Sequence, residues 1–304
     1  MGLVDRLSVG RGMIKRMTYG SSEALRTLAH QHLPFDVAER WVGLLRPAVR
    51  LEAAAAADIA VGQIGGLPKL PVDVEWPSWA GHGPLSFIAS LDCALLPVGA
   101  VDIMLPAEGT LSFFYFDGQL DDGDALVLAE DRESWGGARV LYTPAEEKWG
   151  ERDVPAGLQP YPKVPLTARL GMTTSEPWHP QVRDVFAPGA PLGNRYDHPV
   201  CSRDFLDALW EFDREVGHQI GGHAHSVQNP VEIEVAEAVM DRDVSWGDPA
   251  LDKEISNWVL LTQFDSDDAA DMMWGDAGAL YWLIRPQDLA ERRFDRAMFT
   301  WQCS

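Results

Sequence analysis

The sequence predicts an α+β fold in which two duplicated, mostly antiparallel β-sheet units, related by a pseudo-twofold axis, follow an N-terminal helical segment. Three observations support this prediction: helical apolar spacing in the first fifty residues, short apolar runs between Gly and Pro from residue 59 onward, and motifs that recur in the same order. We expect a helical segment at 1–58 and a domain at 59–304, divided into a first unit at 59–144, a Pro/Gly-rich excursion at 145–200 and a second unit at 201–304.

The first fifty residues have the apolar spacing of two helices. Leu25, Leu28 and His32 fall on one face of the first helix. The Ser21-Ser22 pair precedes this helix as a cap, and Pro34 ends it because proline cannot continue the hydrogen-bond ladder. The second apolar stripe, interrupted at Arg46-Pro47 near its C-terminal end, consists of Val37, Trp41, Leu44 and Leu45.

From residue 59 onward the pattern is typical of strands and turns. Four large rings in succession, at 113–116, occupy both faces of one strand, so this strand should lie inside a covered sheet. Helical spacing returns at 203–216, with Ser202 as the cap. The expected strands are 85–91, 110–116, 125–129, 139–142, 231–235, 258–264 and 280–284.

An internal repeat is the most informative feature of the chain. Ile64-Gly65-Gly66 recurs as Ile220-Gly221-Gly222, and a glycine pair beside a strand indicates positive φ or a close backbone approach. The run at 87–92 recurs at 260–265, and the run that begins at Gly109 recurs from Gly278. Because loops change length more readily than strands, the drift in the spacing between copies fits a duplicated sheet unit.

Composition limits the classes of partner. The chain has 304 residues, 46% of them hydrophobic, and a net charge of −21, which repels nucleic acid and anionic membrane surfaces. Between Lys69 and Arg132 there is no Lys or Arg but many Asp and Glu residues. We therefore expect an acidic face that suits a basic protein partner, and neither nucleic acid nor membrane as partner.

The cysteines and the N-terminus predict a cytoplasmic protein. Cys93, Cys201 and Cys303 are far apart and form no C-x-x-C pair, so reduced thiols are expected. Charged residues interrupt the N-terminal sequence before the apolar run of a secretory signal develops, and no run reaches the length of a membrane-spanning helix.

Several motifs together resemble the YwqG-like family, a bacterial domain of unknown function. The likeness covers roughly residues 59–303 and includes Ile64-Gly-Gly-Leu-Pro-Lys-Leu-Pro, Trp76-Pro77, Phe87-Ile-Ala-Ser-Leu-Asp, His218-Gln-Ile-Gly-Gly, Leu260-Leu-Thr-Gln-Phe-Asp and the segment that begins Trp274-Gly-Asp. The resemblance implies an α+β fold with duplicated sheets, a cytosolic setting, no established catalytic activity and an interaction or immunity role.

The chain departs from the family pattern at two places. The family's Gln before the hydrophobic-Asp pair is Ser90 in the first repeat, whereas the second repeat keeps Gln263. His223-Ala224-His225 stands where the family has Tyr-Pro after the second glycine pair. A pocket lined by that Gln and Tyr would therefore be altered in this protein.

Three histidines are the candidate metal ligands. His218, His223 and His225 lie within eight residues, and a His-x-His pair on a strand directs both rings to one face, as zinc or another divalent metal requires. The alternative is a loop whose histidines form local hydrogen bonds. No cofactor is expected if the alternative holds.

The other candidate binding residues are two aspartates, two tryptophans and their neighbours. Asp92 and Asp265 end equivalent strands, so they either meet as an acid-base pair across the pseudo-twofold axis or cap the turns that follow. Aromatic rings beside acidic residues suit a sugar or a partner protein. The full set is Trp76, Asp92, Gln263, Asp265, Trp274 and Asp276.

The sequence therefore leaves three functions open. The leading one is a non-enzymatic, acidic protein-binding module of immunity type, because the nucleophile elbow, H-E-x-x-H and P-loop motifs are absent from the sequence. The second is a metal-binding protein or metal-dependent hydrolase that uses His218, His223 and His225. The third is a small-molecule or carbohydrate binder in a crevice between the repeats.

Overall fold

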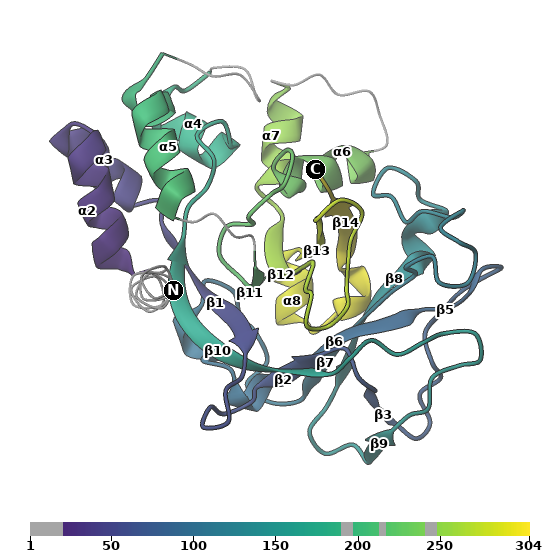
Figure 1. Cartoon of the computed structure of the whole chain (residues 1–304). Helices are drawn as coiled ribbons and strands as arrows, with labels where there is room; N and C mark the ends of the chain where they lie inside the picture. The colour runs from purple at the N-terminus through teal and green to yellow at the C-terminus, as the bar shows by residue number, and fades with distance from the viewer. Residues whose placement is uncertain (1–20, 190–196, 213–216, 241–247) are drawn as a thin grey trace, which may run out of the picture.

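A computed structural model describes residues 21–189, 197–212, 217–240 and 248–304, and shows a mixed α/β fold with one large antiparallel sheet (Figure 1). The sheet has ten strands and curves into a nearly closed wall. In spatial order the strands are β14 (Met298–Gln302), β13 (Ala279–Ile284), β12 (Val259–Asp265), β11 (His218–Ile220), β1 (Arg46–Ala53), β10 (Val164–Thr173), β2 (Gly62–Ile64), β6 (Ser86–Asp92), β7 (Thr110–Tyr115) and β8 (Ala138–Thr143).

The two long strands β1 and β10 form the centre of the sheet. They pair from Arg46 opposite Thr173 to Ala53 opposite Leu166. On the far side of β1 lie β11 to β14, and on the far side of β10 lie β2, β6, β7 and β8. Each of these two runs begins with a strand of three residues, β11 or β2. The centre of the sheet therefore separates two runs of four strands.

The two runs pair their strands in matching register. In one run β2 pairs with β6, and the register of β6 on β7 shifts between Phe87 and Ala89. In the other run β11 pairs with β12, and the register of β12 on β13 shifts between Leu260 and Thr262. The corresponding opposed pairs are Gln63 with Ser90 and Gln219 with Gln263, and then Asp92 with Thr110 and Asp265 with Ala279.

Each three-residue strand is followed by a glycine pair in the left-handed region. The φ angles are 64° at Gly65, 76° at Gly66, 64° at Gly221 and 72° at Gly222. Only glycine adopts two such conformations in succession without strain, and the carbonyls of such a turn face inward, where they need donors.

A glutamine amide supplies those donors in both turns. Gln63 Nε2 donates to the carbonyls of Gly65 at 2.8 Å and Leu67 at 3.2 Å. Gln219 Nε2 donates to the carbonyls of Gly221 and His223, both at 2.8 Å. The two Gln-Ile-Gly-Gly turns therefore share one hydrogen-bond design.

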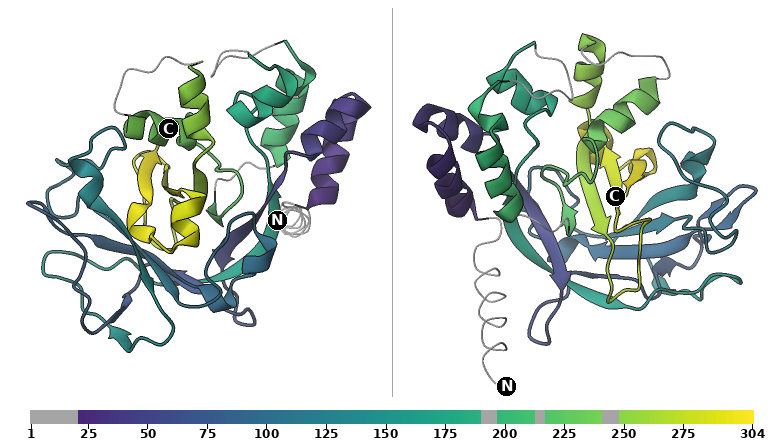
Figure 2. Two further views of the ribbon diagram at one scale, coloured as in Figure 1. Left: turned by 180° about the vertical axis from the view of Figure 1, so that it is seen from behind. Right: turned by 45° about the horizontal axis from the view of Figure 1, so that its top comes forward.

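The helices gather at two places on the sheet. One group, which stands beside β1 and β10 in Figure 2, comprises α2 (Ser22–His32), α3 (Phe35–Val42), α4 (Pro180–Phe186) and α5 (Arg203–Phe212). The other group comprises α6 (Val231–Met240) and α7 (Pro249–Ile255), whereas α8 (Pro286–Ala290) lies apart from them in Figure 1 and packs into the main core through Leu289. Two small sheets pair β3 (Lys69–Pro71) with β9 (Trp149–Glu151), and β4 (Ser78–Trp79) with β5 (Gly83–Pro84).

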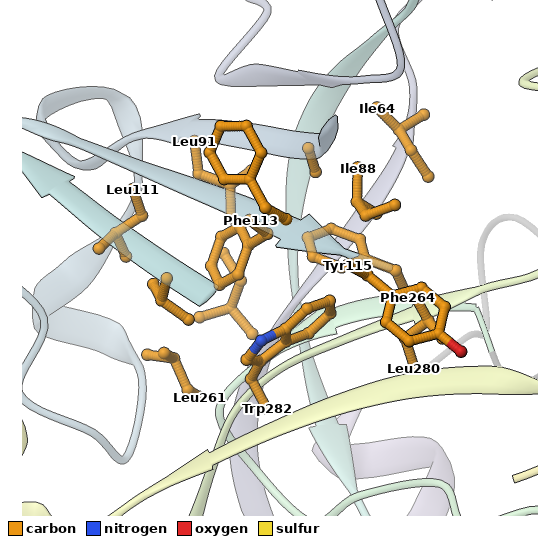
Figure 3. Close-up of a cluster of buried hydrophobic side chains, with 14 of the residues drawn as sticks. Ile64, Ile88, Leu91, Leu111, Phe113, Tyr115, Leu261, Phe264, Leu280 and Trp282 are labelled. Carbon is orange, nitrogen blue, oxygen red and sulfur yellow. The ribbon is translucent and has the colours of Figure 1, made fainter. Parts of the chain in front are cut away.

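The main core lies where the curved sheet packs on itself. Phe113 on β7 meets Phe264 on β12 with ring centroids 5.2 Å apart and Trp282 on β13 at 5.4 Å (Figure 3). Tyr115 stacks on Phe299 of β14 at 4.8 Å. These rings are almost fully buried, so contact between the two runs of strands supplies much of the apolar burial that stabilises the fold.

Most of the predicted elements are confirmed. Ser21 Oγ accepts from the Ala24 N–H and caps α2, and α3 and α5 also begin within the predicted helical stretches. The predicted strands at 85–91, 110–116, 139–142, 258–264 and 280–284 correspond to β6, β7, β8, β12 and β13. The last four residues of the helix predicted at 203–216 lie outside the described residues.

Two predicted strands are wrong. Residues 231–235 begin the helix α6, which is buried on most sides and so lacks the one-sided apolar stripe that would reveal a helix in the sequence. Residues 125–129 form no strand, because their backbone donors go to turn side chains: Ala125 N donates to Asp121 and Leu128 N to Ser134.

Two central strands were not predicted. β1 follows α3 directly, within the segment expected to be helical, and β10 lies within the expected surface excursion at 145–200. Both pair on each side, so these segments build the sheet. Within the described residues, no helix is both long enough and apolar enough to cross a membrane.

We expect Gly222→Ala to lower the free energy of unfolding by about 2–4 kcal/mol, because the substitution adds left-handed strain and a clash. A Cβ at Gly222 would lie 2.5 Å from Thr173 Oγ1 and 2.8 Å from Ala48 Cβ. Gly81 has a φ of 85° with no atom within 4 Å of an added Cβ, so Gly81→Ala should cost about 1 kcal/mol. Urea unfolding measures both variants, and equal losses would contradict this account.

Candidate functional site

A pocket of about 420 Å³ lies beside the second Gln-Ile-Gly-Gly turn. Three segments form its walls: residues 173–178 after β10, residues 223–227 after the turn, and the helix α5, which Figure 1 shows above β11. Pockets of a few hundred Å³ suit small organic ligands. The lining residues are Thr173, Thr174, Ser175, Glu176, Pro177, Trp178, Leu206, Asp207, Leu209, Trp210, Gln219, His223, Ala224, His225, Ser226 and Val227.

Hydrogen bonds across the sheet fix one wall of the pocket. Thr173 Oγ1 donates to the carbonyl of Arg46 and accepts from the His223 N–H at 2.8 Å. His223 Nε2 lies 2.9 Å from the carbonyl oxygen of Leu44, so this ring nitrogen carries the proton and donates. The turn that follows β11 is thereby tied to β1 and to the segment before it.

Gln219 lines the pocket and has an unused acceptor. Its side chain is fully buried, and its Nε2 is committed to the two turn carbonyls. Its Oε1 has no hydrogen-bond partner among the described residues. A buried carbonyl oxygen without a donor costs about 1–3 kcal/mol, so a donor that enters the pocket recovers this free energy.

Glu176 presents a second oxygen without a partner. Burial raises the pKa of this carboxyl to about 7, a hydrogen bond from the Trp178 side chain lowers it, and the nearby Glu232 raises it. Glu176 Oε2 is buried and has no partner within the described ranges. The carboxyl is therefore divided between protonated and ionised forms at neutral pH.

Behind Glu176 lies a recess of about 10 Å³ that is lined by further titratable groups. His179 Nε2 and Glu232 Oε2 are 3.9 Å apart there. Burial lowers the pKa of His179 to about 3 and that of His223 to about 4, and it raises the pKa of Glu232. Both imidazoles are therefore neutral at pH 7.

The opposite wall of the pocket is largely apolar. Leu206, Leu209 and Trp210 come from consecutive turns of α5, and Trp178 faces them from the segment after β10. Trp210 is 61% exposed, which is unusual for so large an apolar side chain. The pocket therefore combines buried oxygen acceptors with an aromatic and aliphatic wall.

The three predicted metal ligands are divided between two places. His223 and His225 line the pocket, where His225 N donates to Gln263 Oε1. His218 lies on β11, where its Nδ1 accepts from Asp265 N and its Nε2 lies 3.2 Å from Asp267 Oδ2. Among the described residues no group of three or more His, Cys, Asp or Glu is placed to hold a metal ion. Metal binding by these histidines stays a prediction of the sequence.

The two repeat aspartates, Asp92 and Asp265, each accept a hydrogen bond from a backbone N–H group. Asp92 accepts from the Ala94 N–H and caps a short helical turn, and Asp265 accepts from the Gly217 N–H. Burial raises the pKa of Asp265. Gln263 donates to the Gly217 carbonyl, so it holds the entry to β11. The contact of Asp92 is the one that the capping alternative describes, whereas Asp265 binds the residue before β11 instead of the turn that follows it.

The predicted aromatic residues take part in packing. Trp76 is half-buried, donates to the Leu85 carbonyl and meets Phe114 edge to face. Trp274 is buried and packs edge-on against Tyr115. Asp276 is exposed. A role for these residues in binding a ligand stays a prediction.

Glu176, Gln219 and Trp210 were not among the predicted site residues. Gln219 had a usable signal, since it belongs to the repeated Gln-Ile-Gly-Gly motif, but nothing local distinguishes a turn-holding glutamine from one that also faces a pocket. Glu176 lies in the Pro/Gly-rich stretch at 145–200, where the pattern indicates only a surface excursion.

Comparison with known proteins adds one match. A protein-family model described as "Domain of unknown function (DUF1963)" matches residues 62–303. A search of curated proteins found no match. The matched range includes the pocket and all sheet strands except β1.

We expect Glu176→Gln to change how stability depends on pH. Because the folded protein holds this carboxyl at a raised pKa, near 7, wild type binds a proton that the unfolded chain releases above about 4.5. Raising the pH from 5 to 7.5 should therefore lower the free energy of unfolding of wild type by about 2 kcal/mol more than that of Glu176→Gln. Denaturation midpoints measured across this range test the difference.

The exposed Glu108 provides the control for this measurement. Glu108→Gln should follow the wild-type pH dependence, and the buried histidines affect all three proteins alike. Parallel pH profiles for wild type and Glu176→Gln would show that Glu176 is not desolvated.

Proposed function

We propose that this chain, which belongs to the family described as Domain of unknown function (DUF1963), binds a small organic ligand in the pocket beside the second Gln-Ile-Gly-Gly turn. One observation carries the proposal: Gln219 and Glu176 both line a cavity of about 420 Å³, and each has a buried side-chain oxygen, Oε1 and Oε2, without a partner among the described residues. Convergent polar atoms in an otherwise apolar cavity are the usual composition of a ligand site.

The hydrogen bonds of the pocket support binding more than catalysis. The protonated nitrogen of His223 is committed to the Leu44 carbonyl, and Gln219 Nε2 is committed to two turn carbonyls. Groups held in this way position the wall and are poorly suited to transfer protons. The site is therefore assigned a binding role.

We also infer that the two runs of strands descend from one sheet unit, related by a pseudo-twofold axis between β1 and β10. The matching strand registers, the equivalent bulges and the shared glutamine-held turns support this inference. The pocket lies beside the second turn and α5. The ligand site is thus specific to one of the two units, in contrast to the expected crevice between them.

Membership of the narrower YwqG-like group, bacterial origin and a cytoplasmic location remain proposals from the sequence. The motif order supports the first of these, and the family match covers nearly the same residues. Charge and cysteine usage support the cytoplasmic location.

We expect ligands found by a thermal-shift screen to stabilise wild type but not Ala224→Leu. Ala224 lines the pocket, so a larger side chain there reduces the volume available to a ligand. A ligand at one hundred times its Kd stabilises the folded state by about 2.7 kcal/mol, which corresponds to a shift of a few degrees. Melting temperatures with and without each hit measure the effect.

Ala56→Leu is the matched control, because Ala56 is exposed and remote in sequence from the pocket-lining segments. Hits should stabilise this variant as they stabilise wild type. Equal stabilisation of Ala224→Leu would place the binding site elsewhere, and a broad library without a hit would count against the proposed function.

An acidic protein-binding surface is the second candidate. In the segment 70–131, Asp92, Asp117, Asp121 and Asp131 accept hydrogen bonds that shape turns. Other carboxylates of this segment are exposed: Asp73, Glu75, Glu108, Asp122, Asp124 and Glu130. These exposed carboxylates would attract a basic protein partner. The pocket gives more specific support to a small ligand, because two of its lining residues have buried oxygens without partners among the described residues.

If this surface binds a basic protein, co-purified partners should be lost between 50 mM and 500 mM salt, since screening weakens long-range attraction. At low salt, the amount of partner that co-purifies with the variant Asp122→Asn/Asp124→Asn/Glu130→Gln should be roughly tenfold lower than with wild type. Recovery that is independent of salt and of these substitutions would remove the acidic-surface proposal.

A further inference from the structure

The two pocket-lining residues that have an unpartnered buried oxygen, Gln219 and Glu176, need donors from a ligand. Gln219 Oε1 accepts only, and an ionised Glu176 accepts only. The proton of His223 Nε2 is directed out of the pocket, toward the Leu44 carbonyl. A ligand that fits this arrangement must therefore bring N–H or O–H donors.

The charges around Glu176 indicate whether the donor group of the ligand is charged or neutral. The charged group that acts on Glu176 is Glu232, a second buried carboxyl. Arg46 acts on Glu232, His179 and His223, and both histidines are neutral at pH 7. Thus Glu176 has no cation against it in the described part of the chain, although its environment disfavours its own charge.

From these contacts we propose that the ligand is an organic cation, an amine or guanidinium group on an apolar body. Its N–H groups donate to Gln219 Oε1 and Glu176 Oε2, which are the unpartnered buried oxygens of the described pocket-lining residues. Its apolar body lies against Leu206, Leu209 and Trp210 of α5, and Trp178 offers an aromatic face to the charge. This inference rests on the proposed function and specifies its ligand class.

Binding of such a cation is coupled to the loss of one proton. The Glu176 carboxyl releases its proton to solvent and pairs with the ligand as a carboxylate, while the ligand stays protonated. Other titratable groups near the site are His179, His223, His225, Asp207 and Glu232. His179 and His223 are already neutral above pH 6, and Asp207 is exposed on α5, 3.5 Å from Arg203.

The experiment compares amines with alcohols of the same shape. Isothermal titration calorimetry of the full chain uses tryptamine and phenethylamine against tryptophol and 2-phenylethanol, at pH 6 and pH 8. Because the pKa of Glu176 is raised to about 7, the amines should bind about tenfold more tightly at pH 8 than at pH 6. The alcohols should bind more weakly and independently of pH.

Proton release is measured on wild type alone, so this part does not depend on a variant that folds. Titrations at pH 6 in two buffers of different ionisation enthalpy should show nearly one proton released per amine bound. Amine binding without proton release, or alcohols that bind as tightly as amines, would overturn the inference. In the latter case the pocket would still be a ligand site.

Two variants test whether the carboxylate that pairs with the amine is that of Glu176. Glu176→Gln should lose the tenfold pH dependence and the preference for amines, whereas Asp204→Asn, which removes an exposed carboxylate of α5 outside the pocket lining, should keep both. A preserved pH dependence in Glu176→Gln would overturn the inference. If all four probes and the ligand screen fail to give binding, both the ligand class and the proposed function are wrong.

Discussion

The fold depends on two glutamine side chains, the half-buried Gln63 and the fully buried Gln219, that hold paired glycine turns. Two successive left-handed residues reverse the chain within a very short length, but they turn carbonyls inward, where unmet acceptors are costly. Gln63 and Gln219 meet those carbonyls from inside the strands that lead into the turns. The strands β2 and β11 therefore end at fixed positions, which sets the register of β6 and β12, and the rest of each run pairs onto these strands.

The same turn leads to different surroundings in the two runs. After the first glycine pair come Leu67 and Pro68, whereas His223 and Ala224 follow the second. His223 extends the hydrogen-bonded network to Thr173 and Leu44, so the second turn is fixed beneath the helical group that contains α5. A polar turn below and an apolar helix above leave a lined cavity between them, and Gln219 is part of its lining.

The sequence predicts those elements whose own pattern is decisive. The aromatic strand β7 and the apolar strands β6, β12 and β13 carry continuous hydrophobic runs, and Ser21 marks the start of α2. Alternation at 231–235 indicates a strand, but tertiary packing buries Glu232 on a helix, which outweighs the local pattern. β1 contains Pro47 and the buried Arg50, so its place at the centre of the sheet depends on pairing with distant β10. The candidate site depends on the same long-range arrangement, because its two acceptors lie far apart in sequence and meet only after β10 and β11 have joined the sheet.

The choice of glutamate at position 176 has a physical cost that a neutral residue would avoid. Glutamine has nearly the same shape and carries no charge to desolvate, so structural stability alone favours it above pH 5. The glutamate becomes advantageous when a positive charge enters the cavity, because the ionised carboxylate then gains an attraction that is strong in a poorly solvated site. Glu232 adds to the cost of the charge, and the neutral imidazoles of His179 and His223 do not offset it. Because His179 and His223 are neutral at pH 7 and the carboxyl of Glu176 can ionise when a cation enters, the occupancy of the pocket is coupled to the charge of its ligand.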